Sequence, residues 1–169
     1  AAEKYSKEKT ANSMNNQLIS DIGQWKNSSL DSARRAIDIS PRIYSNWEAM
    51  EKIYIGLIAM GFYDYIPDAI NAIDKAILLN PLNFEMYYSQ AQIYVIKGEK
   101  DSALGSLAKV LSINPEHVPS LVLAADLNKE KGNLSAYESY LSAAKKILEN
   151  QKVTESEIYK QIVQKLAEI

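Results

Sequence analysis

Apolar and small residues recur at helical spacing in paired segments along most of the chain, with short breaks between them. In residues 84–117, a first stripe contains Tyr87, Ala91 and Tyr94, and a second covers residues 103–111. Spacings of three and four residues place such side chains on one face of an α-helix. Gly98 separates the two stripes, and Pro115 excludes a further helical turn. The pattern therefore predicts a helix–turn–helix unit.

The same unit recurs at a fixed period. Pro81 and Pro115 stand 34 residues apart, and so do Gly98 and Gly132. A period between roughly 20 and 50 residues is typical of repeat solenoids, in which each unit buries its apolar face on the next unit. The sequence therefore predicts an all-α fold.

The clearest copy resembles the tetratricopeptide repeat, whose pattern is W-x2-L-G-x2-Y, then A-x3-F, then P. The corresponding residues are Tyr87, Gln90, Ala91, Tyr94, Ala103, Leu107 and Pro115. The resemblance implies a right-handed α-solenoid of helix pairs, in which small residues allow close helix contacts.

Four units are expected in residues 10–151. Residues 84–117 are the regular copy, and residues 118–151 keep its register. In this last copy Tyr137 replaces a small residue and Glu149 replaces the proline. We therefore expect a wider helix pair there, with a second helix that continues past residue 148.

The unit at residues 44–83 is longer than the others. Pro41 and Pro81 are 40 residues apart, which leaves six extra residues after Trp47. We expect the first helix to extend to about Met60, followed by a turn at residues 61–64. A second helix should then start near Ile66.

The two ends of the chain are less regular. Residues 1–9 are interpreted as a polar lead-in, and residues 10–43 as a degenerate first repeat with two helices. Residues 152–169 are predicted to form a capping helix that seals the last apolar face. The alternative is that this helix opens a further repeat. Thr154 and Glu157 have the spacing of a capping box, and Asp101 is placed to cap the second helix of the regular copy.

Composition offers little chemistry for catalysis. The chain carries 19 basic and 21 acidic residues, one histidine and no cysteine. This balance does not indicate nucleic acid binding, and no apolar run is long enough for a membrane span. Without cysteine there is no thiolate or Cys-based zinc site. His117 has no motif-spaced partner and is expected to face solvent. We therefore predict no catalytic residue, cofactor or metal, and no enzyme activity.

Arg34, Arg35 and Arg42 form a small basic cluster. Because Asp31 and Asp38 lie between them in the sequence, we interpret the cluster as a solvated helix face. The alternative is a contact with an acidic partner or with lipid phosphates.

The tetratricopeptide resemblance also implies a binding surface. Side chains two, five and nine places into each unit line the concave groove of such solenoids. Here they are Ser45, Glu48, Lys52, Glu85, Tyr88, Gln92, Pro119, Val122 and Asp126. The set is mixed and lacks the lysines and asparagines with which chaperone-binding members hold a C-terminal carboxylate. It favours an extended peptide or protein segment, so we predict a non-catalytic protein-interaction module.

A weaker resemblance concerns the context of the module. Residues 39–47, followed by the lengthened repeat, look like the tetratricopeptide tails of bacterial O-antigen ligase-like or polymerase-like membrane proteins. It implies an accessory, extracytoplasmic domain of a glycan-handling enzyme, whose partner is the membrane domain of its own full-length chain. The start at Ala1, without an initiator Met, leads us to expect a processed protein or a soluble fragment of a larger bacterial one. A cytoplasmic location remains the alternative.

Overall fold

The computed structural model describes the backbone of residues 2–168 and the side chains of residues 16–168. Within these residues the chain consists of helices and turns and contains no strand, which confirms the all-α fold. The chain divides into two compact units, Ala1–Leu79 and Asn80–Ile169. Each unit is described by itself below.

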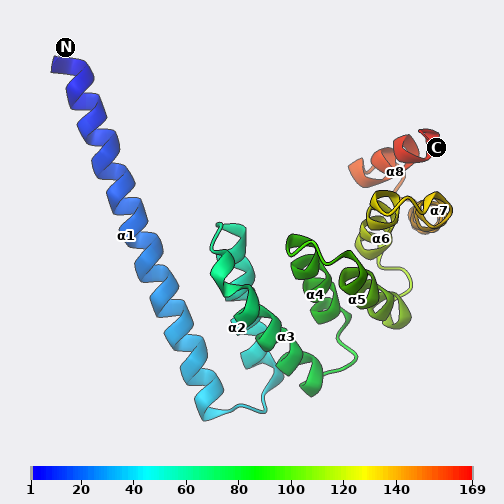
Figure 1. Cartoon of the computed structure of the whole chain (residues 1–169), viewed down its shortest axis with the longest axis horizontal. Coiled ribbons are helices and arrows are strands. Elements are labelled where there is room, and N and C mark those ends of the chain that lie inside the picture. Colours follow the sequence, from blue (N-terminus) through cyan, green and yellow to red (C-terminus); the bar gives the residue numbers. More distant parts are fainter. Residues whose placement is uncertain (1, 169) are drawn as a thin grey trace. The chain divides into compact units, whose positions relative to one another are not determined.

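Unit 1 contains three α-helices and one short 3-10 helix. They are α1 (Ala2–Ile39), α2 (Tyr44–Ala59), η1 (Tyr63–Tyr65) and α3 (Ile66–Leu79). Helix α2 packs on both α3 and α1 (Figure 1), and the buried core includes Leu57 and Ile73. Gly61, with φ of 93°, makes the turn that follows α2. The predicted lengthened helix, turn and second helix at residues 44–79 are thereby confirmed.

The prediction of two helices within residues 10–43 is wrong. One helix, α1, runs without interruption from Ala2 to Ile39 and also includes the predicted lead-in. The physical reason is the absence of a strong breaker. Gly23 is the one glycine of this segment and stays helical, at a cost of about 1 kcal/mol, and the first proline is Pro41. The N-terminal part of helix α1 therefore projects past the region in which α1 contacts α2 (Figure 1).

Unit 2 contains two helix hairpins and a terminal helix. Its elements are α4 (Phe84–Ile96), α5 (Lys100–Ile113), α6 (Val118–Glu130), α7 (Leu134–Asn150) and α8 (Glu157–Ala167). Gly98 and Gly132 make the two hairpin turns with φ of 76° and 77°, a region that favours glycine because it has no Cβ. The predicted extension of α7 past residue 148 is confirmed.

Two predicted helix caps are wrong. Helix α5 begins at Lys100, so Asp101 lies in its first turn and pairs with Lys131. At α8 the N-cap is Ser156, whose Oγ accepts a hydrogen bond from the Tyr159 backbone N–H at 3.3 Å. The Ser156 hydroxyl also donates to the Val153 carbonyl at 2.8 Å. Residues 151–156 form the turn between α7 and α8, so α8 begins beyond Thr154.

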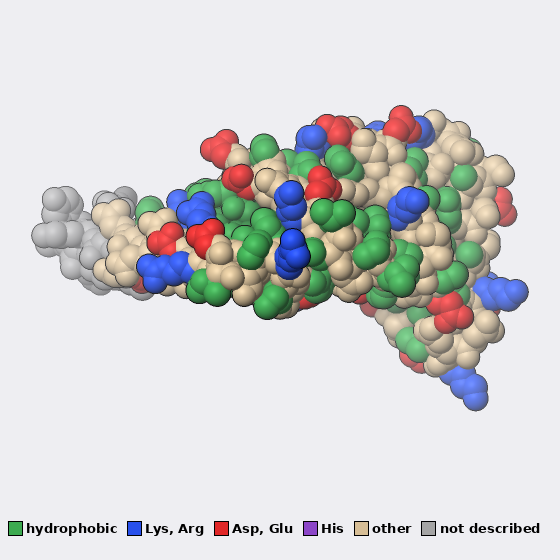
Figure 2. All heavy atoms as spheres, turned by 90° about the horizontal axis from the view of Figure 1, so that it is seen from below, with side chains coloured by type: hydrophobic (Ala, Val, Ile, Leu, Met, Phe, Trp, Pro, Cys, Tyr) green, Lys and Arg blue, Asp and Glu red, His purple; other side chains and the backbone are tan. Residues whose placement is uncertain are grey.

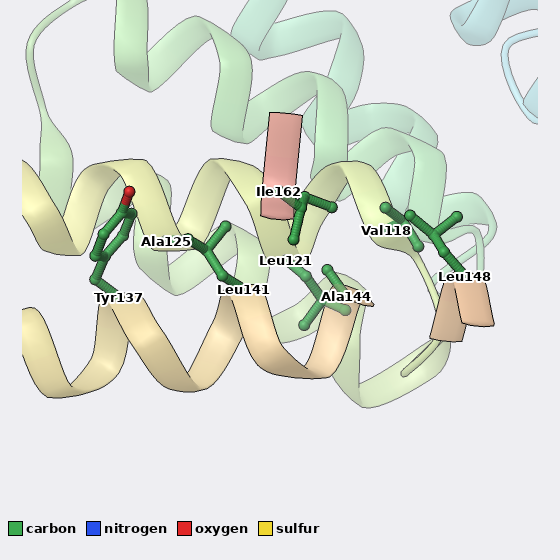
Figure 3. Packing of buried hydrophobic residues seen from close by; sticks show 8 residues of the cluster. All are labelled: Val118, Leu121, Ala125, Tyr137, Leu141, Ala144, Leu148 and Ile162. Atoms are coloured by element: carbon green, nitrogen blue, oxygen red, sulfur yellow. The ribbon is translucent and has the colours of Figure 1, made fainter. Parts of the chain in front are cut away.

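Helix α8 covers the apolar face of the α6–α7 hairpin. Ile162 is 1% exposed and lies in one cluster with side chains of both helices (Figure 3), namely Val118, Leu121, Ala125, Tyr137, Leu141, Ala144 and Leu148. A sealing helix and the first helix of a further repeat would both make this contact, so the sealing role stays a prediction.

Candidate functional site on the first helices of each pair

The predicted groove residues of unit 1 lie along one side of α2. Ser45 and Lys52 are exposed, and Glu48 is half-buried. The Lys52 ammonium contacts the Glu48 carboxylate at 2.9 Å, one helical turn away, and this hydrogen bond is the main cause of the raised pKa of Lys52. The pair cancels its own charge locally, so this part of the face offers a neutral, polar surface.

In unit 2, the first turns of α4 carry an aromatic cluster. The ring of Tyr88 meets His117 edge-on at a centroid distance of 5.0 Å, and Phe84 meets it at 5.2 Å. Glu85 and Gln92 are exposed beside the half-buried Tyr88. Burial, followed by the nearby charge of Glu85, raises the pKa of Tyr88. The phenol therefore stays neutral and serves as an apolar surface with one polar end.

The prediction that His117 faces solvent is wrong. Its ring is half-buried, and its Nδ1 lies 2.8 Å from the hydroxyl oxygen of the buried Ser120. Burial lowers the pKa of His117, against a smaller opposing effect of Glu85. The histidine thus works as a neutral packing residue that ties the turn before α6 to the face of α4.

The α6 part of the predicted set is largely engaged within the unit. Val122 packs against the buried cluster around Ile162. The Lys165 ammonium of α8 contacts both carboxylate oxygens of Asp126, at 2.5 Å and 2.8 Å. Pro119 is exposed in the first turn of α6. Helix α8 therefore occupies part of the face that the sequence assigned to a ligand.

The arginines of the basic cluster are exposed, as expected for a solvated face, but only Arg34 and Arg35 lie on helix α1. Arg34 pairs with Asp31 along α1 at 3.7 Å, whereas Arg42 lies in the turn after α1, beside Trp47 and Lys75. On the face shown in Figure 2, acidic and basic side chains are interspersed with hydrophobic ones. Charge is therefore mixed over this surface.

The described part of the chain offers neither a metal centre nor a membrane span. No group of three or more His, Cys, Asp and Glu side chains is placed there to hold a metal ion. No helix there is both long and apolar enough to cross a membrane.

Sequence reasoning missed two contacts in unit 2. The Asp126–Lys165 pair joins residues 39 positions apart, so no local pattern reveals it. The sequence indicates only weakly that His117 packs on Tyr88. Tyr88 lies on the exposed side of α4, and His117 lies in the turn that follows the second helix of the same repeat. Neither contact follows from the repeat period.

Comparisons with known proteins address the family and the fold. A family model described as tetratricopeptide repeat matches residues 84–117. A curated plant relative, Protein NPGR2 of Arabidopsis thaliana, is 28% identical over 104 residues, which cover 60% of this chain and 13% of that protein. The chain therefore corresponds to a small part of that relative.

Solved structures of bacterial proteins are also similar to the chain. The Yersinia enterocolitica type III secretion translocator chaperone SycD has a TM-score of 0.65 at 17% identity, covering 79% of this chain and 96% of SycD. A second SycD structure, in complex with a peptide of the translocator YopD, has a TM-score of 0.53 at 18% identity, covering 70% and 92%.

TTC0263, a thermophilic TPR protein of Thermus thermophilus, has a TM-score of 0.66 at 19% identity and covers 85% of this chain and 74% of its own. At these identities the likeness shows the fold. Residues 84–117 are therefore a tetratricopeptide repeat, and the chain has the fold of tetratricopeptide-repeat proteins.

Proposed function

We propose that the chain is a non-catalytic protein-interaction module that binds a peptide or protein segment along the exposed faces of its first helices. The observation that carries this proposal is the α4 face, where Tyr88 is braced by His117 between the exposed Glu85 and Gln92. A tyrosine held by its neighbours loses little conformational entropy on binding and offers a large contact area. Exposed acid and amide groups on either side supply hydrogen bonds that orient a peptide.

Two findings support this assignment. Residues 84–117 form a repeat of a family whose members include peptide-binding proteins, and a structure of SycD, a protein with a similar fold, contains a peptide of its translocator. The single histidine is held between aromatic rings and a buried hydroxyl, which leaves it a packing role. That this chain also binds a peptide is our proposal.

The test uses peptides selected on the whole chain from a phage-displayed library. Their affinities are then measured by fluorescence anisotropy on the wild type and on the double variant Tyr88→Ala, Gln92→Ala. Loss of an aromatic anchor and its neighbouring amide should weaken binding about tenfold or more. Circular dichroism should stay native, because Gln92 is exposed and Tyr88 half-buried.

The matched control is Glu138→Ala, Ser142→Ala on α7. These two residues have the same four-residue spacing and are both exposed, so the control should bind the selected peptides with unchanged affinity. Equal binding by the α4 variant and the wild type would show that the α4 face is not the site.

A second candidate function is an accessory domain of an envelope glycan-handling membrane enzyme, with the membrane domain of its own full-length chain as partner. Tyr63, which is 60% exposed beside the exposed Phe62, favours it, because aromatic rings stack on sugars. Titration with O-antigen oligosaccharides, followed through the resonances of these two rings, tests this candidate. If the oligosaccharides shift the resonances of other residues equally in the wild type and in a Tyr63→Ala variant, Tyr63 does not bind the sugar. That result would argue against this second function.

A further inference from the structure

A small apolar hollow with a basic rim lies in unit 1, and none of the α2 residues assigned to the groove lines it. Its volume is about 340 Å³, and it is lined by Pro41, Arg42, Trp47, Lys75, Leu78 and Leu79. The first three residues come from the turn after α1 and the start of α2, and the others from the last turns of α3. This volume is near the lower end of ligand pockets, which span roughly 300–1,000 Å³.

The wall on the α1–α2 side is fixed by hydrogen bonds. The indole N–H of Trp47 donates to the Pro41 carbonyl at 2.7 Å. The Asn46 amide donates to the carbonyls of Ala36 and Ser40 at 2.9 Å and 3.0 Å. The indole ring is thereby held in one orientation before any ligand arrives, which lowers the entropic cost of binding.

The opposite wall is apolar and remains accessible. Leu78 is 74% exposed and Leu79 is 37% exposed. Large aliphatic side chains next to a fixed indole make a surface that favours another apolar side chain. The hollow thus has room for one large side chain of a partner.

The charge at the rim is positive. Arg42 and Lys75 both line the hollow, and neither forms an ion pair with a carboxylate among the residues that the structure describes. The neighbouring Asp74 is not one of the lining residues. Two exposed cations beside an apolar surface complement a carboxylate that is carried next to an apolar side chain.

The next repeat does not reproduce this combination. Its Tyr87 hydroxyl donates to the Pro81 carbonyl at 3.3 Å, in the same way as Trp47 to Pro41. However, the positions that correspond to Arg42 and Leu78 are Leu82 and Ser112. Of the two cations, only Lys75 has a counterpart, Lys109. The basic, apolar hollow is therefore a particular feature of unit 1 and not a necessary result of the repeat.

We infer that this hollow is a second binding site, which takes a peptide segment carrying a large apolar side chain beside a carboxylate. Trp47, Leu78 and Leu79 receive the apolar side chain, and Arg42 and Lys75 hold the carboxylate. A bounded hollow with two cations suits a peptide better than an anionic membrane, because lipid surfaces are read by clusters of roughly four to eight basic residues. The site is independent of the α4 face proposed above.

The test follows the two tryptophan indole resonances of the ¹⁵N-labelled whole chain. The probe is acetyl-Glu-Leu-Phe-Glu-amide, and acetyl-Lys-Leu-Phe-Lys-amide is its charge-reversed counterpart. The acidic peptide should shift the Trp47 resonance saturably, while Trp25 on α1 stays in place. The double variant Arg42→Gln, Lys75→Gln should bind about tenfold or more weakly, because it loses charge-assisted hydrogen bonds. Arg42→Lys should retain most of the affinity.

Lys109→Gln is the matched control, since it removes the corresponding cation of the next repeat and should leave the affinity unchanged. Equal shifts with the acidic and basic peptides, or no saturable shift at Trp47, would overturn the inference. A shift produced by phosphatidylserine vesicles but not by the peptide would assign the cations to a membrane surface instead. None of these results affects the α4 test, whose variants lie in unit 2.

Discussion

Helix α1 at the start of unit 1 and helix α8 at the end of unit 2 differ in how far their apolar residues are buried. Helix α8, with 11 residues, buries Ile162 at 1% exposure. Helix α1, with 38 residues, leaves Leu18 and Ile19 at 56% and 67% exposure, although Leu30 nearer its C-terminal end is 3% exposed. The apolar pattern of the two helices does not explain this difference in burial, since both carry apolar residues at helical spacing.

Helix length relative to the neighbour explains it. At a rise of about 1.5 Å per residue, α1 is about 57 Å long, whereas α2 is about 24 Å long. Only the C-terminal part of α1 can therefore find cover on α2. Helix α8 is shorter than α7 and finds cover along its length. An apolar stripe becomes core only where the same unit supplies a surface opposite to it.

The largest expected effect tests this difference directly. Ile162→Ala should cost about 2–5 kcal/mol of stability in unit 2, because it removes a fully buried side chain and leaves a cavity. Leu18→Ala should change stability by less than about 0.5 kcal/mol. Hydrogen exchange by mass spectrometry can separate the units, and Ile162→Ala should speed exchange in α6, α7 and α8 but not in α2 and α3. Equal effects of the two substitutions would contradict the proposed role of α8.

The helix pairs were predictable because their signals are local. Glycines and prolines at a fixed period, with small residues between them, predict the hairpins of residues 44–150, and even the insertion after Trp47 shows in the spacing of Pro41 and Pro81. The first repeat was misjudged because its period was extrapolated where no proline or turn glycine supports it. A repeat period is weak evidence for a turn where the sequence has no residue, such as proline or a turn glycine, that favours one.

The site was less predictable than the fold, because it depends on contacts between distant residues. Glu85 and Gln92 are exposed as the repeat register predicts. By contrast, Asp126 is paired with Lys165, and no repeat rule anticipates the contribution of a terminal helix. The hollow beside Trp47 depends on Arg42 and Lys75, which lie on different elements.

A second, smaller effect concerns the turn that leads into α8. Lys152 has φ of 58°, in the left-handed region that the glycines at the other turns occupy. Lys152→Gly should therefore stabilise unit 2 by up to about 1 kcal/mol, because a side chain in this region is strained. Lys146→Gly is the matched control within α7, and it should destabilise by about 1 kcal/mol. Chemical denaturation followed by circular dichroism measures both, and a loss of stability in both variants would show that Lys152 is not strained.

The smallest expected effect concerns pH and should be confined to unit 2, which holds the single histidine. Burial lowers the pKa of His117 below its usual value of 6.5, so the unfolded chain binds the proton more readily than the folded one. The contribution of the neutral ring is fully present above about pH 6.5 and is lost as the pH falls through the lower pKa of the folded state. Because the ring is half-exposed, the loss should stay below about 1 kcal/mol.

His117→Gln checks this assignment, because glutamine retains polar groups near Ser120 but does not titrate in this range. The wild type should lose stability relative to the variant between about pH 7.5 and about pH 5.5, a window above the usual titration of carboxylates. Exchange rates of α4 and α6 amides should follow the same difference, whereas those of α2 and α3 should not. A parallel pH response of wild type and variant would mean that the ring is not desolvated by Tyr88 and Phe84.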